Sequence, residues 1–443
     1  MFQQEPIMLT DSLLAKILSQ PYTSFLDCNA HAEDHDSSII GIDPVYTFFA
    51  EKDRLIVRQG KKKYFHNDKN IFELIESYIK PCERNKDQRG FRTGFIGMFT
   101  FESARCFSDF NWLKSDDYPE VLGGIYDRYL VMPQDHSQGY FVASTLYGRP
   151  TISFKELQNQ FSNQQNDFKV IGNYNNPQKE TYKQAVNHIL NYIKKGHVYQ
   201  VNFSRQHSVK FDGDLSVLYR QLRTVSPAPY SAYINFKQHH ILSSSPELFF
   251  NVRNNIITTK PIKGTIARGA TPDLDSSLKN QLHESIKDKA ELLMIVDLER
   301  NDLNKICQTG SVKVTSPRAI ESYQYVHHGM AVITGELKKN QTFYSIMKAL
   351  FPGGSITGAP KKRAIEIISE FEKQPRGPYT GCIGYISGNG DLTFNIAIRT
   401  LYSRDNQLLF HTGGGIVSDS VDELEWAECE TKAKGMVETL LTI

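Results

Sequence analysis

The sequence predicts an α+β protein in which large antiparallel β-sheets carry helices on their outside. Short strand-like runs follow one another through tight turns, a pattern that favours antiparallel pairing. The 443 residues are enough for two ordinary domains or one large elaborated domain. Charged residues make up 23% and aromatic residues 11% of the chain, which is typical of a globular protein rather than a disordered or fibrous one.

The charge balance and the cysteines exclude several classes of protein. The net charge is only +2, which gives no electrostatic footprint for nucleic acid or an anionic membrane. The six cysteines form no Cys-x-x-Cys pair, so neither a zinc site nor a disulfide framework is indicated. The N-terminus lacks a signal-peptide pattern, and no apolar run approaches the roughly 18–20 residues that span a bilayer. We therefore expect a cytoplasmic protein with no nucleic-acid or membrane partner.

The first part of the chain is expected to contain short strands and few helices. Its clearest elements are two strands and one helix, predicted at Ser38–Gly41, Tyr140–Thr145 and Ile71–Ile79 respectively. Asn and Gln accumulate over Gln158–Asn176, where we expect a surface connection. The main boundary is therefore placed there, between residues 1–165 and 166–443.

A well-marked helix opens the second region. Asn176 can cap it, Pro177 suits its first turn, and its apolar stripe ends at Gly196. A second helix is predicted from about Ser276 to Val296, because the strongly polar run after Val296 is typical of a helix end. Strands between the two helices are expected at Val198–Arg205, Tyr230–Phe236, Ile241–Ser245, Leu248–Arg253 and Asn255–Thr259.

The last part of the chain returns to strands and closes on a helix. The helix is predicted over Asp422–Leu441. The strands before it are expected at Ser311–Thr315, Ala331–Glu336, Thr380–Tyr385, Asp391–Thr400 and Gln407–Thr412.

Two short segments carry the most informative chemistry. Lys263 lies between a buried-strand pattern and the turn residue Gly264, where its amine can act as a nucleophile. Glu247, on a neighbouring strand, could then protonate a leaving group. The simpler alternative for Lys263 is a lysine on an exposed strand.

Acidic residues on two predicted helices are candidates for binding a metal ion. Glu425, Glu428 and Lys432 share one helical face, where two carboxylates can bind a hard cation such as Mg²⁺ and the lysine can neutralise a bound carboxylate. The alternative is a solvated face with a Glu428–Lys432 pair. Glu291 has the same two interpretations, since Lys287 lies one turn before it.

Two glycine-rich runs and several reactive residue types are weaker signals. Gly413–Gly415 can bring backbone amides close to an anion. The run Phe351–Lys361 fails the P-loop pattern, because Ala359-Pro360 separates its last glycine from the lysine, so nucleotide binding is not expected. Structural roles are expected from residue type and spacing alone for His327, His328, His411 and Cys382.

Taken together, these segments resemble the chorismate-utilising enzymes, the family of anthranilate, aminodeoxychorismate, isochorismate and salicylate synthases. The matching segments keep the family's order, and they are Gly196–Arg205, Ser244–Leu248, Pro261–Thr265, Lys287–Asp302, Val326–His328, Pro352–Lys361, Gly381–Tyr385 and Gly413–Lys432. A weaker N-terminal match extends the likeness over nearly the whole chain. The resemblance implies a sandwich of antiparallel sheets, with an N-terminal region of the anthranilate synthase component I type in residues 1–165 and a chorismate-binding catalytic domain in 166–443.

Two positions indicate the branch of the family. Isochorismate and salicylate synthases carry a water-activating lysine where this chain has Gln200, so the resemblance implies ammonia as the nucleophile. Anthranilate synthases normally have alanine where this chain has Lys263, which looks like the aminodeoxychorismate synthase branch. The expected product is 4-amino-4-deoxychorismate, a step toward 4-aminobenzoate and folate. The alternatives are an anthranilate synthase component I and a catalytically silent chorismate-binding subunit.

The resemblance also implies the members of the site. Lys263 would attack C2 of chorismate while Glu247 protonates the departing 4-hydroxyl, so we expect a lowered pKa for the lysine and a raised pKa for the glutamate. The implied Mg²⁺ ligands are Glu291 and Glu428, with Glu425 close by. The implied substrate-binding residues are Lys432, Gly413, Gly414 and Gly415 for the ring carboxylate, Tyr385 and Arg399 for the enolpyruvyl carboxylate, and Thr265, Ser355, His328 and Gly264 around the ring.

The implied partner is a separate glutamine amidotransferase subunit that supplies ammonia. This expectation follows from the sequence, in which no cysteine elbow lies near a suitable His and Glu. Relatives often have serine where Cys28 follows Leu26-Asp27 in the segment that binds tryptophan, so tryptophan binding is left open.

Overall fold

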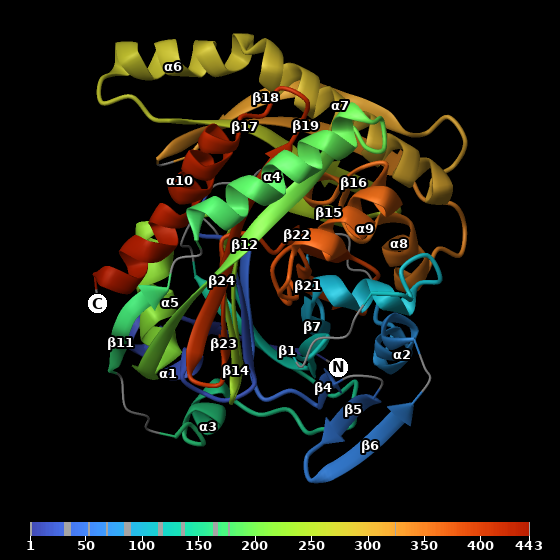
Figure 1. The fold of residues 1–443 in the computed structure, drawn as a ribbon. Helices are drawn as coiled ribbons and strands as arrows, with labels where there is room; N and C mark the ends of the chain where they lie inside the picture. The colour runs from blue at the N-terminus through green and yellow to red at the C-terminus, as the bar shows by residue number, and fades with distance from the viewer. Residues whose placement is uncertain are drawn as a thin grey trace.

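The computed structural model describes residues 2–30, 37–51, 54–67, 70–83, 90–113, 118–133, 138–162, 167–175, 178–323 and 325–442. Its strands form two twelve-stranded sheets, and every pairing recorded in these ranges is antiparallel. Figure 1 shows the helices arranged around the outside of the sheets. The α+β architecture with antiparallel sheets is therefore confirmed.

The first sheet contains strands from both ends of the chain. In spatial order they are β1 (Phe2–Ile7), β10 (Gly139–Ser144), β9 (Arg128–Pro133), β3 (Ser37–Gly41), β2 (Thr23–Asp27), β13 (Tyr230–Phe236), β14 (His239–Ser245), β23 (Thr400–Arg404), β24 (Gln407–Ile416), β12 (Gln200–Gly213) and β11 (Phe168–Asn175), with β20 (Gly358–Ala359) beside β12.

The second sheet also combines strands from the N-terminal and C-terminal parts of the chain. Its spatial order is β17 (Ile262–Ala267), β19 (Val326–Glu336), β16 (Ile256–Lys260), β15 (Leu248–Arg253), β22 (Leu392–Ile396), β21 (Cys382–Ser387), β7 (Gly94–Phe99), β8 (Val121–Tyr126), β4 (Tyr46–Glu51), β5 (Arg54–Gln59) and β6 (Lys62–Asn67), with β18 (Lys313–Ser322) beside β19. Both sheets therefore contain strands from either side of the predicted boundary near residue 165.

The helices are distributed along the whole chain. They are α1 (Asp11–Leu18), α2 (Ile71–Tyr78), α3 (Phe154–Gln158), α4 (Lys179–Lys194), α5 (Leu215–Val225), α6 (Pro272–Glu284), α7 (Ile286–Ile306), α8 (Phe343–Leu350), α9 (Lys361–Phe371) and α10 (Asp422–Leu441), with 3-10 turns η1 (Phe101–Cys106) and η2 (Gly354–Ile356). In the described part of the chain, none of the helices combines the length and the apolar character needed to cross a membrane.

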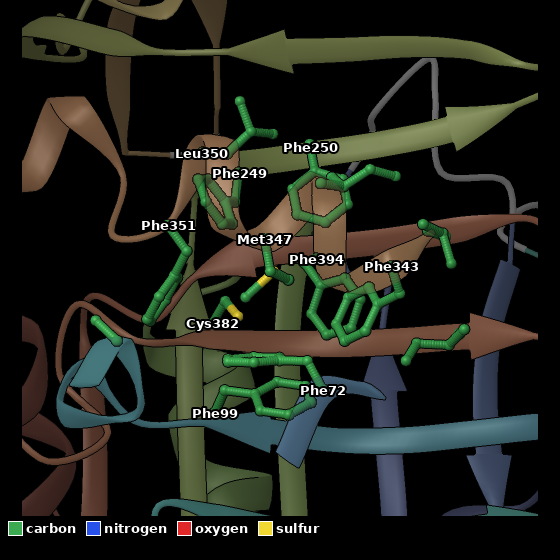
Figure 2. Packing of buried hydrophobic residues seen from close by; sticks show 14 of the residues in the cluster. Phe72, Phe99, Phe249, Phe250, Phe343, Met347, Leu350, Phe351, Cys382 and Phe394 are labelled. Atoms are coloured by element: carbon green, nitrogen blue, oxygen red, sulfur yellow. The ribbon is translucent and has the colours of Figure 1, made fainter. Parts of the chain in front are cut away.

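Three apolar layers hold the sandwich together. The inner layer joins residues of both sheets, such as Ile234 of β13 and Leu122 of β8. A second cluster packs α1, α5 and α10 on the outer face of the first sheet. A third packs α2, α7 and α8 on the outer face of the second sheet, where Phe72 stacks on Phe99 and Phe343 stacks on Phe394 (Figure 2).

The single helix predicted at Ser276–Val296 is wrong. Two helices, α6 and α7, meet at Ser285, whose hydroxyl accepts a hydrogen bond from the Asp288 amide, and α7 continues to Ile306. The polar run after Val296 does not end the helix, because its buried Asp302 carboxylate receives Lys361 Nζ at 2.6 Å and Lys305 Nζ at 2.7 Å. The lysine of the glycine-rich run is thus half of an internal ion pair.

Other boundaries also differ from the prediction. The expected connection over Gln158–Asn176 contains strand β11, which pairs with β12. The run Asp391–Thr400 is divided between β22 and β23, which belong to different sheets. The proposed helix cap Asn176 and Pro177 lie outside the described residues, and α4 begins at Lys179.

Candidate active site

A cavity of about 480 Å³ lies at one end of the sandwich, where the chain passes between the sheets. Glu247 follows β14 of the first sheet and precedes β15 of the second. Arg399 lies on the return passage between β22 and β23. Both residues line the cavity, so residues far apart in sequence meet there because the chain changes sheets at those points.

A β-bulge directs Lys263 into this cavity. The register of β17 against β19 shifts between Ile262 and Thr265, and Gly264 within the shift has a φ of +84°. Such a φ favours glycine, and a Cβ at Gly264 would lie 2.8 Å from Asp288 Cγ. Lys263 lines the cavity. The alternative of an exposed strand lysine is wrong.

Ser355 of η2 contacts both proposed catalytic residues. Its hydroxyl donates a 2.7 Å hydrogen bond to Glu247 Oε1, and its carbonyl oxygen accepts one from Lys263 Nζ at 3.4 Å. Glu247 is buried. The amine and the carboxyl group predicted from the sequence are therefore both hydrogen-bonded to the same residue, Ser355, inside the cavity.

The pKa values of these two groups move in opposite directions, as expected from the sequence. Burial lowers the pKa of Lys263, with a further decrease from Lys432 and an opposing effect from Glu291. Burial raises the pKa of Glu247, against the hydrogen bond from Ser355. Both shifts favour the uncharged form of the group.

Three carboxylates from helices α7 and α10 also line the cavity. Glu291 comes from α7, and Glu425 and Glu428 come from α10. β24 lies close against them, since a Cβ at Gly414 would be 3.3 Å from Glu425 Oε2 and 3.5 Å from Glu428 Oε1. Lys432 Nζ ends in the same place, 2.7 Å from Glu428 Oε1, and donates to the Gly413 carbonyl at 3.0 Å.

Each carboxylate already has a local partner. Lys287 Nζ lies 3.9 Å from Glu291 Oε1, and the Ser420 hydroxyl donates to Glu425 Oε1 at 2.7 Å. The ion pairs considered as simple alternatives are therefore present, but their carboxylates face the cavity rather than forming a plain solvated surface. Burial alone would raise the pKa of Glu428, and the Lys432 ammonium holds it below its usual value.

The carboxylates fit the ligand chemistry of a hard cation. Within the described residues, no group of three or more His, Cys, Asp or Glu side chains has the arrangement of a metal site. Mg²⁺ does not require one, because it keeps several waters and binds proteins through one or two carboxylates plus oxygens of the substrate. Glu291 and Glu428, which line the cavity together with Glu425, offer that kind of donor set.

Arg399 carries a positive charge that no neighbour balances. No hydrogen bond or ion pair joins its guanidinium to another residue that the structure describes, and burial lowers its pKa. His328 is similar: its Nδ1 pairs with the Thr265 hydroxyl at 2.7 Å, whereas its buried Nε2 has no partner among the described residues. Burial lowers the pKa of His328 to about 3, so the ring is neutral. Unpaired groups of this kind leave the cavity ready for an anionic ligand.

The prediction for Tyr385 is wrong in its placement. Side chains of β21 alternate between faces, and Tyr385 points into the layer between the sheets, where its ring packs on Phe91 at 5.6 Å. It does not line the cavity. Tyr379 does, with its ring stacked on His411 at 5.1 Å. Tyr379 could not be predicted from the sequence beyond its position just before the matching segment Gly381–Tyr385.

Gln200 lies directly behind the cavity wall. It is fully buried, its carboxamide atoms have no partner among the described residues, and a Cβ at Gly415 would lie 2.8 Å from its Nε2. The other predicted residues Thr265, Ser355, Gly264, Gly413 and Gly415 line the cavity. Sequence reasoning missed Asn202, His411, Thr412 and Met436, which also line it.

Comparison with known proteins agrees with this geometry. Residues 25–438 match the model of the chorismate binding enzyme family, and the chain belongs to that family. It is 36% identical to anthranilate synthase component 1 of Saccharolobus solfataricus over 82% of this chain and 84% of that protein. It is 36% identical to aminodeoxychorismate synthase component 1 of Klebsiella aerogenes, over 95% and 94% respectively.

The solved structures include a similar fold. Anthranilate synthase component I from Streptococcus pneumoniae matches with a TM-score of 0.77 at 27% identity, covering 92% of this chain and 93% of that one. The sandwich expected from the resemblance is thereby confirmed.

Replacing Gly264 tests whether the bulge positions Lys263. We expect Gly264→Ala to lower chorismate turnover by about 10²-fold, because the strained backbone and the contact with Asp288 displace the amine. Gly196→Ala is the matched control, since Gly196 has a φ of +76° but nothing within 4 Å of its Cβ position. Both changes should cost about 1 kcal/mol of unfolding free energy, measured by urea titration. Equal turnover in the two variants would contradict the role of the bulge.

Proposed function

We propose that this chain is the large subunit of a Mg²⁺-dependent aminodeoxychorismate synthase. It converts chorismate and ammonia to 4-amino-4-deoxychorismate and water. The observation that carries the proposal is the Lys263 amine and the Glu247 carboxyl held at Ser355 in one cavity, with pKa shifts that favour the neutral amine and the protonated acid.

The reaction has two halves that balance in atoms and protons. Lys263 adds through its neutral nitrogen to C2, both ring double bonds shift (C1=C2 to C1=C6 and C5=C6 to C4=C5), and the C4–oxygen bond breaks as Glu247 donates a proton, releasing water. Ammonia then forms a bond to C4, and the lysine leaves C2 as a neutral amine. Glu247 regains its proton from the new ammonium group, so the enzyme returns to its starting state.

The remaining residues would bind and orient the substrate. Arg399, with no anionic partner of its own, would hold the enolpyruvyl carboxylate, and Lys432 with the Gly413–Gly415 strand would lie near the ring carboxylate. Glu291 and Glu428, with Glu425 nearby, would hold Mg²⁺. The bound ion would supply positive charge that fixes the ring carboxylate and lowers the pKa of nearby amines.

The second candidate is anthranilate synthase component I, because relatives of both names match the chain at similar identity. Lys263 favours the first assignment, since the resemblance gives anthranilate synthases alanine at that position. Incubation with chorismate, Mg²⁺ and ammonium decides between them. Direct formation of fluorescent anthranilate would reject our assignment, whereas a product that needs an added lyase to give 4-aminobenzoate supports it.

Ammonia would come from a separate glutamine amidotransferase subunit. The relatives are named as component 1 of their synthases, which supports a second component. The chain would then use free ammonium in isolation and glutamine only in the presence of that partner.

Lys263→Ala tests the covalent step. Mixing the wild-type protein with chorismate and Mg²⁺ without ammonia should give an intact mass increased by one chorismate less one water. The variant should show no such adduct and lose most synthesis, while still binding chorismate in equilibrium dialysis. Full synthesis by the variant would rule out the nucleophile.

Ser355→Ala tests the protonation state of Glu247. The Ser355 hydroxyl donates to the carboxylate and so lowers its pKa; its removal should raise the pKa of Glu247 further above its ordinary value. In the bell-shaped pH profile of kcat/KM, the limb set by Glu247 should move to higher pH and the limb set by Lys263 should stay. A profile in which neither limb moves would contradict the acid role.

Glu428→Ala tests the metal site. Loss of one carboxylate should weaken Mg²⁺ about 10–100-fold in activity titrations. Glu423→Ala is the control on the same helix, because Glu423 pairs with Lys183 of α4 and does not line the cavity. An unaltered titration for Glu428→Ala would show that Glu428 does not bind the ion.

A further inference from the structure

A second cavity of about 570 Å³ adjoins the catalytic one. We call it the antechamber; it lies between α10, the loop that follows α5 and the start of β19, and its lining includes Ser226, Ala228, Lys434, Gly435 and Glu438. His328, Arg399 and Lys432 line both cavities. The two cavities therefore adjoin at these three residues, which include Arg399 and His328, each with a group that has no partner among the described residues.

The two cavities differ in charge. The antechamber carries three cations, Arg399, Lys432 and Lys434, against the single carboxylate of Glu438. The catalytic cavity carries more carboxylates than cations, and its carboxylates include Glu291, Glu425 and Glu428. A dianion that approached along those carboxylates would be repelled, whereas the antechamber would attract it.

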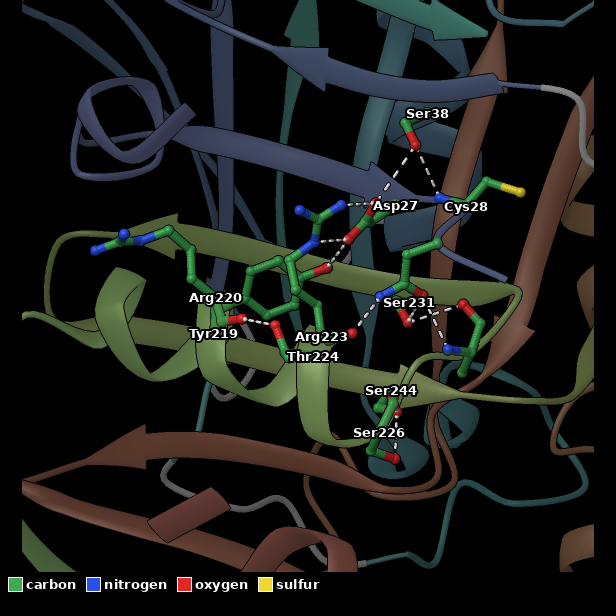
Figure 3. Close-up of polar contacts among 12 residues, drawn as sticks. Asp27, Cys28, Ser38, Tyr219, Arg220, Arg223, Thr224, Ser226, Ser231 and Ser244 are labelled. Atoms are coloured by element: carbon green, nitrogen blue, oxygen red, sulfur yellow. Dashed lines mark hydrogen bonds and ion pairs between the residues drawn. The ribbon is translucent and has the colours of Figure 1, made fainter. Parts of the chain in front are cut away.

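The wall of the antechamber is fixed by hydrogen bonds. The Ser244 hydroxyl donates to Ser226 (Figure 3). The Ala228 amide donates to Asn29 Oδ1 at 2.9 Å. The Ser231 hydroxyl donates to the Ala228 carbonyl at 3.0 Å. The loop after α5 is thus tied to strands of the first sheet, so the antechamber is a preformed space rather than a transient gap.

We propose that the antechamber is the access route and first binding site for the dicarboxylate substrate. Lys434 at its exposed end attracts the dianion, Lys432 and Arg399 at its inner end receive it, and the substrate then moves into the catalytic cavity. Only the identity of the dicarboxylate as chorismate rests on the proposed function. Because the substrate enters through the antechamber, Glu291, Glu425 and Glu428 of the catalytic cavity remain available to bind the metal ion.

The test is the association rate of chorismate with the whole protein, measured by stopped-flow protein fluorescence with Mg²⁺ and without ammonia. Lys434→Glu should slow association about tenfold at low ionic strength, and the difference should shrink as salt is added. Lys362→Glu, on the exposed surface of α9, changes the net charge equally and should leave the rate as it is. Equal slowing by both variants would overturn the route.

A size series at Gly435 provides a second measurement. A Cβ there would lie 3.6 Å from Ser226 Oγ, an ordinary contact, so a larger side chain would extend across the antechamber. Association should slow more for Gly435→Phe than for Gly435→Ala, with the product unchanged. If both variants bind chorismate at the wild-type rate, the access route is overturned even if the proposed synthesis is confirmed. If association slows as expected but a different product forms, the proposed function is overturned and the access route stands.

Discussion

Removal of charged groups from water at the end of the sandwich is the constraint on which the site depends. Lys263, Glu247 and Arg399 are held in one cavity, where burial favours the uncharged form of the first two. For Lys263 and Glu247, the cost of burial is reduced by nearby opposite charges and by hydrogen bonds to Ser355. Because little water screens charges inside the cavity, each remaining charge acts strongly on a bound anion.

Two buried charged residues away from the cavity, Arg376 and Asp302, have partners within the chain, and they contrast with Arg399. Arg376 is almost fully buried and donates to Glu372, to two backbone carbonyls and to Thr380. Asp302 is paired with Lys361. Arg399 has no such partner among the described residues. A buried cation that has no anionic partner and lies beside a cavity can bind a carboxylate of a substrate. A buried cation that is paired with a carboxylate of the chain instead stabilises the packing of the fold.

The layered architecture explains how two cavities can serve one reaction. The inner cavity is formed where the chain changes sheets and receives its carboxylates from α7 and α10. The antechamber lies along the next turns of the same α10, which present Lys434, Gly435 and Glu438. One helix therefore contributes Glu425 and Glu428 to the inner cavity and Lys434 to the antechamber, and Lys432 borders both.

The sequence by itself determined the antiparallel α+β class, the family and most of the proposed site residues that the structure places at one cavity, because Lys263, Glu247, Glu428 and their neighbours stand in short local motifs. Local pattern also predicted strands such as β13 and β15 and the helix α10. It failed where long-range contacts decide: the polar run after Val296 remains helical because Lys361 neutralises Asp302, and Tyr385 is directed inward by its place in β21. The assignment of strands to sheets, and hence the meeting of Glu247 with Arg399, was decided only by the tertiary structure, since sheet membership depends on pairing between distant segments.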